Sequence, residues 1–178
     1  VDLKELAALY GQQGNRAAMI RAMRDVLAID PADPDALTLV EDDLRARREY
    51  GDLREVLAAA VRAPHCPPDA RIPRLREIAR LSTDHLKDAD AAVDAWREIL
   101  NSGPADVEAL AELDPLLEHG ERWDELVMVL EQRAELTEAP ELRRTLLGRL
   151  ADLHRDRRDD PVAEAAVVAM LWEAAPED

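Results

Sequence analysis

Apolar residues recur along this 178-residue chain at intervals of three and four, the spacing of one face of a helix. The pattern continues with short breaks from one end of the sequence to the other, and the breaks are too short to join anything but antiparallel helices. Ten helices are therefore expected. They span residues 2–13, 15–29, 34–50, 52–63, 70–86, 88–102, 104–119, 122–136, 140–157 and 160–174.

Residues that start and end helices stand at these breaks. Side chains that can accept from free backbone N–H groups at a helix start are Asn15, Asp33, Asp52, Asp69, Asp88 and Asp160. Prolines at expected first-turn positions are Pro34, Pro104 and Pro161. Glycines at expected left-handed helix ends are Gly14, Gly51, Gly103 and Gly120. Pro115, in contrast, is predicted to interrupt the helix at 104–119.

The predicted helices also align with one another, which indicates an internal repeat. Residues 14–31 can be laid over residues 87–104, so that Met23 falls on Trp96 and Pro31 on Pro104. Residues 78–88 can be laid over residues 150–160, so that Leu81 falls on Leu153. Two helices per repeat give a period of about 34 to 36 residues.

This period, together with Leu6, Ala7, Tyr10, Gly14 and the Asp30-Pro31 pair, resembles the tetratricopeptide repeat (TPR) family. The resemblance implies an all-α fold, a right-handed α-solenoid of about five antiparallel helix hairpins. It predicts a single array over residues 1–178, with units at about 1–33, 34–68, 69–103, 104–138 and 139–178. Because the chain begins at Val1 without a methionine, we also expect it to be a segment of a longer protein.

Composition narrows the classes of partner. The chain has 39 acidic and 23 basic residues and a net charge of −16, which disfavours nucleic acid and anionic membrane surfaces as partners. No apolar run approaches the roughly 18 residues of a membrane span, so membrane insertion is not expected. The single cysteine, Cys66, excludes an internal disulfide and fits a reducing compartment, so a cytoplasmic location is predicted.

The sequence holds no recognisable catalytic, cofactor or metal site. Glycine-rich phosphate loops and the spacings of serine hydrolases and zinc proteases are absent from it. His65 and Cys66 are adjacent, but no further cysteine or nearby histidine completes a zinc site. Trp96, Trp123 and Trp172 could form an aromatic ligand pocket, although packing between helices is the favoured interpretation. We therefore predict a protein that is not an enzyme and that needs no cofactor.

The resemblance implies a scaffold or adaptor that binds a partner peptide or protein in a concave groove lined by the first helix of each hairpin. An alternative stays open at this point. The chain could instead be a regulatory or substrate-recognition segment of a larger multidomain enzyme or signalling protein.

The family's groove positions, carried onto this chain, give a mostly basic row. They fall on Lys4, Ala8, Glu41, Arg45, Arg48, Arg76 and Arg80. Because guanidinium groups pair well with carboxylates, Lys4, Arg45, Arg48, Arg76 and Arg80 are predicted to bind an acidic peptide segment. The alternative is that these cations are solvated surface. Arg157 and Arg158 are expected to lie outside the groove.

The last predicted helix is apolar nearly all round, so it lacks the polar face that closes a repeat array. Val168, Leu171 and Trp172 are therefore predicted to meet either a further repeat or a second copy of the chain, with self-association through this helix.

Overall fold

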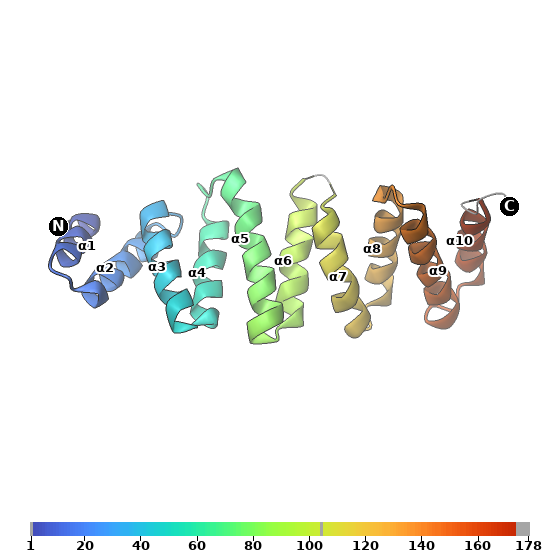
Figure 1. Ribbon diagram of the computed structural model, residues 1–178, viewed down its shortest axis with the longest axis horizontal. Helices are drawn as coiled ribbons and strands as arrows, with labels where there is room; N and C mark the ends of the chain where they lie inside the picture. Colours follow the sequence, from blue (N-terminus) through green and yellow to red (C-terminus); the bar gives the residue numbers. More distant parts are fainter. Residues whose placement is uncertain (1, 104, 174–178) are drawn as a thin grey trace. The chain divides into compact units, whose positions relative to one another are not determined.

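The computed structural model describes residues 2–103 and 105–173 and contains no strand within those ranges. The helices are α1 (Leu3–Gln12), α2 (Arg16–Ile29), α3 (Pro34–Arg47), α4 (Tyr50–Arg62), α5 (Pro68–Leu81), α6 (Ala89–Asn101), α7 (Val107–His119), α8 (Trp123–Leu136), α9 (Pro140–Asp156) and α10 (Pro161–Glu173). A short π-helical turn, η1 (Ser82–Leu86), extends α5. The all-α helical-repeat prediction is confirmed, and most helix ends lie within three residues of the predicted ones (Figure 1).

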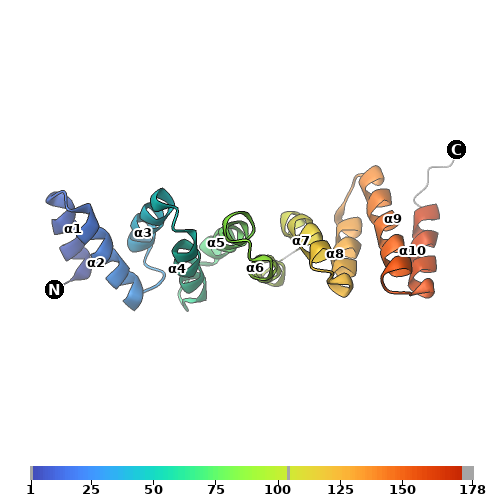
Figure 2. The same ribbon diagram turned by 90° about the horizontal axis from the view of Figure 1, so that it is seen from below.

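The chain forms two compact units, Val1–Ala95 and Trp96–Asp178. In the first unit, α1 packs on α2, α2 on α3, α3 on α4, and α4 on α5. In the second, α7 packs on α8, α8 on α9, and α9 on α10. Figures 1 and 2 show α1 to α5, and separately α7 to α10, each beside the next helix along the chain. Each helix is thus held by its neighbours in the sequence. The division of residues 1–178 into five repeat units of one array stays a prediction.

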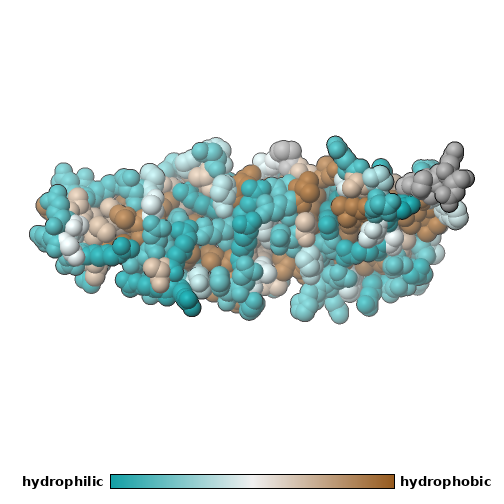
Figure 3. Space-filling view, in the orientation of Figure 1, coloured by the Kyte–Doolittle hydropathy of each residue, from teal (hydrophilic) through white to brown (hydrophobic). Residues whose placement is uncertain are grey.

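Small and branched apolar side chains fill the space between the helices. Alanines without any exposed surface let neighbouring helix backbones approach closely, and leucines fill the remaining volume. Trp96 is buried among them, as its predicted role between helices requires. Hydrophilic residues cover most of the face seen in Figure 3, where hydrophobic residues form smaller separate patches.

Side-chain caps at helix starts are partly as predicted. Asn15, Asp33, Asp88 and Asp160 accept hydrogen bonds from the backbone N–H groups of Ala18, Ala36, Ala91 and Ala163. The prediction is wrong for Asp52 and Asp69, because α4 and α5 begin earlier, at Tyr50 and Pro68. Those two carboxylates lie in the first helical turn. Pro34 and Pro161 open α3 and α10, and Pro104 lies outside the described residues.

The turn inside each hairpin contains a residue in the left-handed conformation. Gly14 has φ +70°, but the corresponding residues in the later hairpins are not glycines. They are Arg48, Lys87, Glu121 and Asp159, with φ between 49° and 59°. The predicted left-handed glycines Gly51, Gly103 and Gly120 do not adopt this conformation. Gly51 lies within α4, and at the end of α7 the next residue along the chain takes the positive φ.

Pro115 does not interrupt its helix, contrary to the prediction. Helix α7 continues through it from Val107 to His119. A proline in a helix leaves the carbonyl four residues earlier without its N–H donor, which is Ala111 here. Because Ala111 is exposed, water can satisfy that carbonyl, and the helix can continue.

Because these turns need a left-handed residue, we expect that introducing a glycine there stabilises the fold and that removing one destabilises it. Replacing Glu121 by glycine removes the steric cost of a Cβ at positive φ and should raise the free energy of unfolding by about 1 kcal/mol. Gly14→Ala should lower it by about 1 kcal/mol, although the space around Gly14 is open. Gly148→Ala is the matched control. Gly148 lies within α9, also in open space, so alanine there should stabilise the helix. Urea unfolding measures all three, and a stabilising Gly14→Ala would contradict the turn conformation.

An ion pair joins α4 to the residue that precedes α6. Arg54 Nη1 donates to Asp88 Oδ2 at 2.6 Å and lies 3.4 Å from the hydroxyl of the fully buried Ser82. The hydrogen bond from Arg54 holds the pKa of Asp88 below its ordinary value of 3.8, helped by the backbone N–H of Ala91. The carboxylate therefore prefers the folded state in its charged form.

The lowered pKa of Asp88 makes the stability of the fold depend on pH. Because the folded pKa of Asp88 is lowered, the stabilisation is fully present above the unfolded pKa and is lost as the pH falls through the folded value. Arg54→Met should cost about 0.5 to 1 kcal/mol at pH 7, since the pair is partly exposed, and the loss should shrink below about pH 4. Denaturant unfolding between pH 7 and pH 3 checks this. Arg21→Met, on the exposed surface of α2, is the control and should show no such trend. A deficit for Arg54→Met that does not vary with pH would argue against the pair.

Candidate functional site

The predicted basic row lies in the first unit, and two of its members are paired with carboxylates. Lys4 Nζ on α1 is 2.5 Å from Asp33 and 3.0 Å from Asp35, and these hydrogen bonds raise the pKa of Lys4. Arg45 on α3 pairs at 2.7 Å with Glu77 of α5. These ion pairs connect the first helices of consecutive hairpins.

The other members of the row differ in their surroundings. Arg76 and Arg80 lie on α5, the first half-buried and the second exposed, and both have interaction partners. Arg48 is exposed and occupies the left-handed turn after α3. Carboxylates of the protein itself therefore already pair with Lys4 and Arg45, as carboxylates of the predicted acidic peptide would. Binding of such a peptide stays a prediction.

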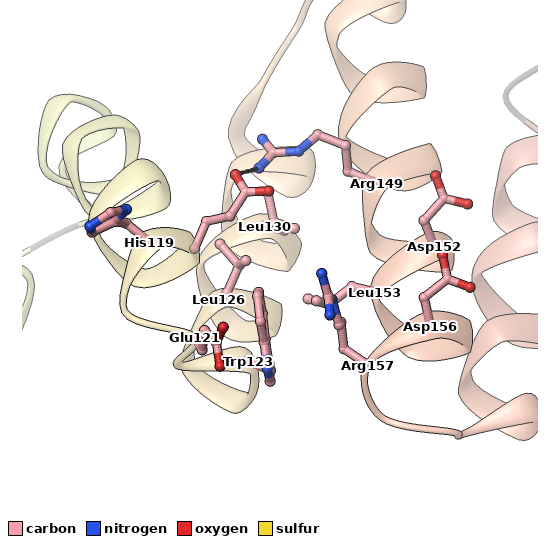
Figure 4. A pocket seen from close by; sticks show the side chains of 11 residues that line it. His119, Glu121, Trp123, Leu126, Leu130, Arg149, Asp152, Leu153, Asp156 and Arg157 are labelled. Atoms are coloured by element: carbon pink, nitrogen blue, oxygen red, sulfur yellow. Dashed lines mark hydrogen bonds and ion pairs between the residues drawn. The ribbon is translucent and has the colours of Figure 1, made fainter.

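The second unit contains an open groove of about 450 Å³ between α7, α8 and α9 (Figure 4). Its floor is apolar and consists of Leu126 and Leu130 of α8 and Leu153 of α9, all of them buried. The rim is polar and comes mainly from the last turn of α7 and one face of α9. Rim residues are Glu118, His119, Glu121, Arg149, Asp152, Asp156 and Arg157.

One end of this groove is formed by an aromatic ring and a cation. The guanidinium carbon of Arg157 lies 4.9 Å from the ring centroid of Trp123, within the range of a cation–π interaction. Figure 4 shows the two side chains next to each other, Trp123 from the start of α8 and Arg157 from the end of α9. Trp123 is only half-buried, so part of its ring remains available to a ligand.

The opposite end is held by a buried carboxylate, Asp114 of α7, which is 4 % exposed. Arg149 of α9 donates to both of its oxygens at 2.8 Å, and Arg133 of α8 also contacts it. Arg149 additionally reaches Glu118 at 3.0 Å, the contact drawn as a dashed line in Figure 4. The hydrogen bonds that Arg149 donates to Asp114 raise the pKa of Arg149. Asp114 therefore fixes the spacing of the three helices that form the groove.

This groove was not expected from the sequence. Arg157 and Arg158 were predicted to lie outside the basic groove of the first helices, and the end of α9 places the Arg157 side chain against Trp123 in this groove of the second unit. Packing between helices was also the favoured interpretation for Trp123, whose aligned positions in other repeats are apolar. The available signal was spacing, since Trp123 and Arg157 lie about one repeat length apart and so fall on adjacent hairpins.

His65 and Cys66 are the candidate metal ligands of the sequence, and both lie in the described part of the chain. His65 Nε2 lies 2.6 Å from Asp30, and the Cys66 thiol lies 3.5 Å from Arg74, so the two adjacent residues face different partners. Among the described residues no three or more His, Cys, Asp or Glu side chains gather as a metal site would require. Over the same residues, every helix is too short or too polar to cross a membrane.

The predicted contact residues of the last helix are unequally exposed. Val168 and Leu171 are half-buried. Trp172 is 77 % exposed.

Comparisons with known proteins concern the fold. No family model matches the sequence, and no curated protein matches it. Among solved structures, YrrB has a TM-score of 0.51 at 11 % identity, over 98 % of this chain and 86 % of its own. MamA has a TM-score of 0.50 at 14 % identity, over 95 % of this chain and 92 % of its own. The chain has a TPR-like helical-repeat fold.

YrrB is described as a TPR protein with an unusual peptide-binding site. In the TPR-like hairpins of the present chain, α7 and α9 are the first helices of two consecutive pairs. The groove of Figure 4 therefore opens between first helices, the elements that the resemblance to the family assigns to the partner-binding face.

Removing the buried carboxylate should loosen the second unit. Asp114→Asn keeps the size of the side chain but leaves Arg133 and Arg149 without their shared anion, so the free energy of unfolding should fall by about 2 kcal/mol. Asp124→Asn removes the exposed partner of Arg158 and should cost less than about 0.5 kcal/mol. Urea unfolding of both variants gives the comparison. Equal effects would mean that Asp114 does not hold the three helices together.

Proposed function

We propose that this protein is a non-catalytic interaction scaffold that holds a peptide segment of a partner protein in the groove between α7 and α9. The observation that carries the proposal is the groove itself, open along its length, with a leucine floor and a charged rim. Such a surface can take an extended peptide, with apolar side chains on the floor and polar groups at the rim. An open groove of this kind does not exclude water, which agrees with binding and not with catalysis.

The rim favours a peptide that carries basic side chains. Carboxylates outnumber guanidinium groups on the groove by four to two, with Glu118, Glu121, Asp152 and Asp156 against Arg149 and Arg157. Arg149 is further neutralised by Asp114. Asp152 and Asp156 are both paired with Arg155, so Glu121 carries the remaining negative charge. A lysine or arginine of the partner would find carboxylates on α9 and the exposed part of the Trp123 ring.

The net charge of the whole chain supports the same choice. At −16, the surrounding field attracts a basic segment and repels nucleic acid and anionic lipid. The proposal needs no cofactor. A cytoplasmic location is part of it, in keeping with the free thiol of Cys66.

Selection from a random displayed-peptide library tests this function with the intact chain. The enriched peptides should combine apolar with basic residues, and a synthetic representative should bind in fluorescence anisotropy. Asp152→Asn with Asp156→Asn should weaken this peptide at least about fivefold, because two rim charges are lost.

The matched control removes two exposed charges elsewhere. Asp25→Asn with Glu55→Gln makes the same change in net charge on α2 and α4 and should leave the affinity nearly unchanged. A library that yields no binding peptide would overturn the proposed function. So would a selected peptide that binds both double variants equally well.

A further inference from the structure

A second groove, of about 420 Å³, lies in the second unit on another face of α9. Helices α8 and α10 form its walls, and α9 forms its floor with Leu147, Leu150 and His154. The walls are mostly apolar and partly made of small residues. They include Val127, Ala134, Ala163, Ala166, Val167 and Met170. No described residue lines both this groove and the one beside Trp123, so the two grooves are separate.

Polar groups on this groove lack partners among the described residues. His154 is only 3 % exposed, and its Nδ1 has no hydrogen-bond partner. Glu131, Glu135 and Arg143 lie at the rim, exposed, and none of them is in an ion pair within the described part of the chain. A buried polar atom without a partner is costly, and most other arginines of the second unit are paired. These groups indicate that the surface is completed by another molecule.

The adjoining face of α10 is apolar and exposed. Val162 and Trp172 are more than three-quarters exposed, and Met170 is 48 % exposed. Between them, Ala165, Ala166 and Ala169 are exposed alanines, which would let another helix approach closely. An exposed apolar surface that extends from a groove across a whole helix face is too large for a small ligand.

A two-fold rotation of a second copy would place the acidic residues around this groove opposite basic residues of the other copy. Glu135 and Arg143 flank the turn between α8 and α9, so they mark one end of the groove. Arg158 and Asp160 flank the turn between α9 and α10 and mark the other end, where Arg158 also contacts the exposed Asp124 and Asp160 caps α10. Each end therefore carries one acid and one base. A two-fold axis that exchanges the ends brings acid to base at both.

We propose that this groove and the exposed face of α10 form a dimer interface with a second copy of the chain. The two α10 helices cross antiparallel near Ala166, and Met170 of each copy enters the other's groove. Arg143 then faces the partner's Asp160, and Glu135 faces the partner's Arg158.

Sedimentation velocity from about 1 to about 300 µM tests self-association, a range that covers weak dimers. The chain should change from monomer to dimer as its concentration rises. Met170→Glu places a charge in the apolar groove and should raise the dissociation constant at least about tenfold. Met128→Glu is the matched control, since Met128 is 61 % exposed on α8 and does not line the groove, and it should dimerise normally. A wild-type chain that stays monomeric throughout overturns the proposal and leaves the groove to a different protein.

Crosslinking gives a readout that does not depend on disrupting the interface. In a Cys66→Ser background, Ala166→Cys should be joined rapidly by a short bis-maleimide, because the axis passes near this position in both copies. Met128→Cys, equally accessible but away from the axis, should react with the reagent without forming dimers. A dimer that is joined through position 128 and not through position 166 would overturn this interface. Far-UV circular dichroism of each variant confirms that it is folded.

Discussion

Burial of one apolar stripe of each helix against its sequence neighbours is the constraint on which the rest of this structure depends. The chain has no phenylalanine and few aromatic residues, so alanine and leucine must fill the core. Fully buried alanines bring the helix backbones close, and the leucines beside them exclude water. No strand takes part in this packing within the described residues. The helical periodicity of the sequence is therefore sufficient to define the architecture.

Charged residues add a second set of contacts on the first helices of the hairpins. Lys4 reaches Asp35, Arg45 reaches Glu77, and Arg149 reaches Asp114, each pair linking one first helix to the next within a unit. These side chains lie on the elements that the resemblance to TPR proteins assigns to partner binding. Their charges are already partly balanced within the protein, so the local charge of each surface follows from the surplus that remains and not from the number of arginines. In the groove of the second unit that surplus is negative.

The sequence was sufficient to predict the helices, because periodicity and caps act locally. Asn15, Asp33 and Asp160 cap the helices expected of them. Prediction failed where the packing of one helix on another decides. Arg48 and Glu121 take left-handed conformations that glycine would adopt at lower cost, and the neighbouring Gly51 and Gly120 do not. The contact of Trp123 with Arg157 and the sharing of Asp114 by two arginines depend on side-chain directions across three helices, which spacing alone does not specify.

The restriction of contacts to near neighbours has a mechanical consequence. Within each unit, the packing and the ion pairs described above join a helix to the next helix or to the one after it. A pulling force applied across such a unit is carried by the helix–helix interfaces in series, while each ion pair between first helices spans two of these interfaces. The weakest interface should therefore yield first while the others keep their packing. Extension would proceed in steps of about one hairpin, and released hairpins could re-pack on the neighbours that remain folded.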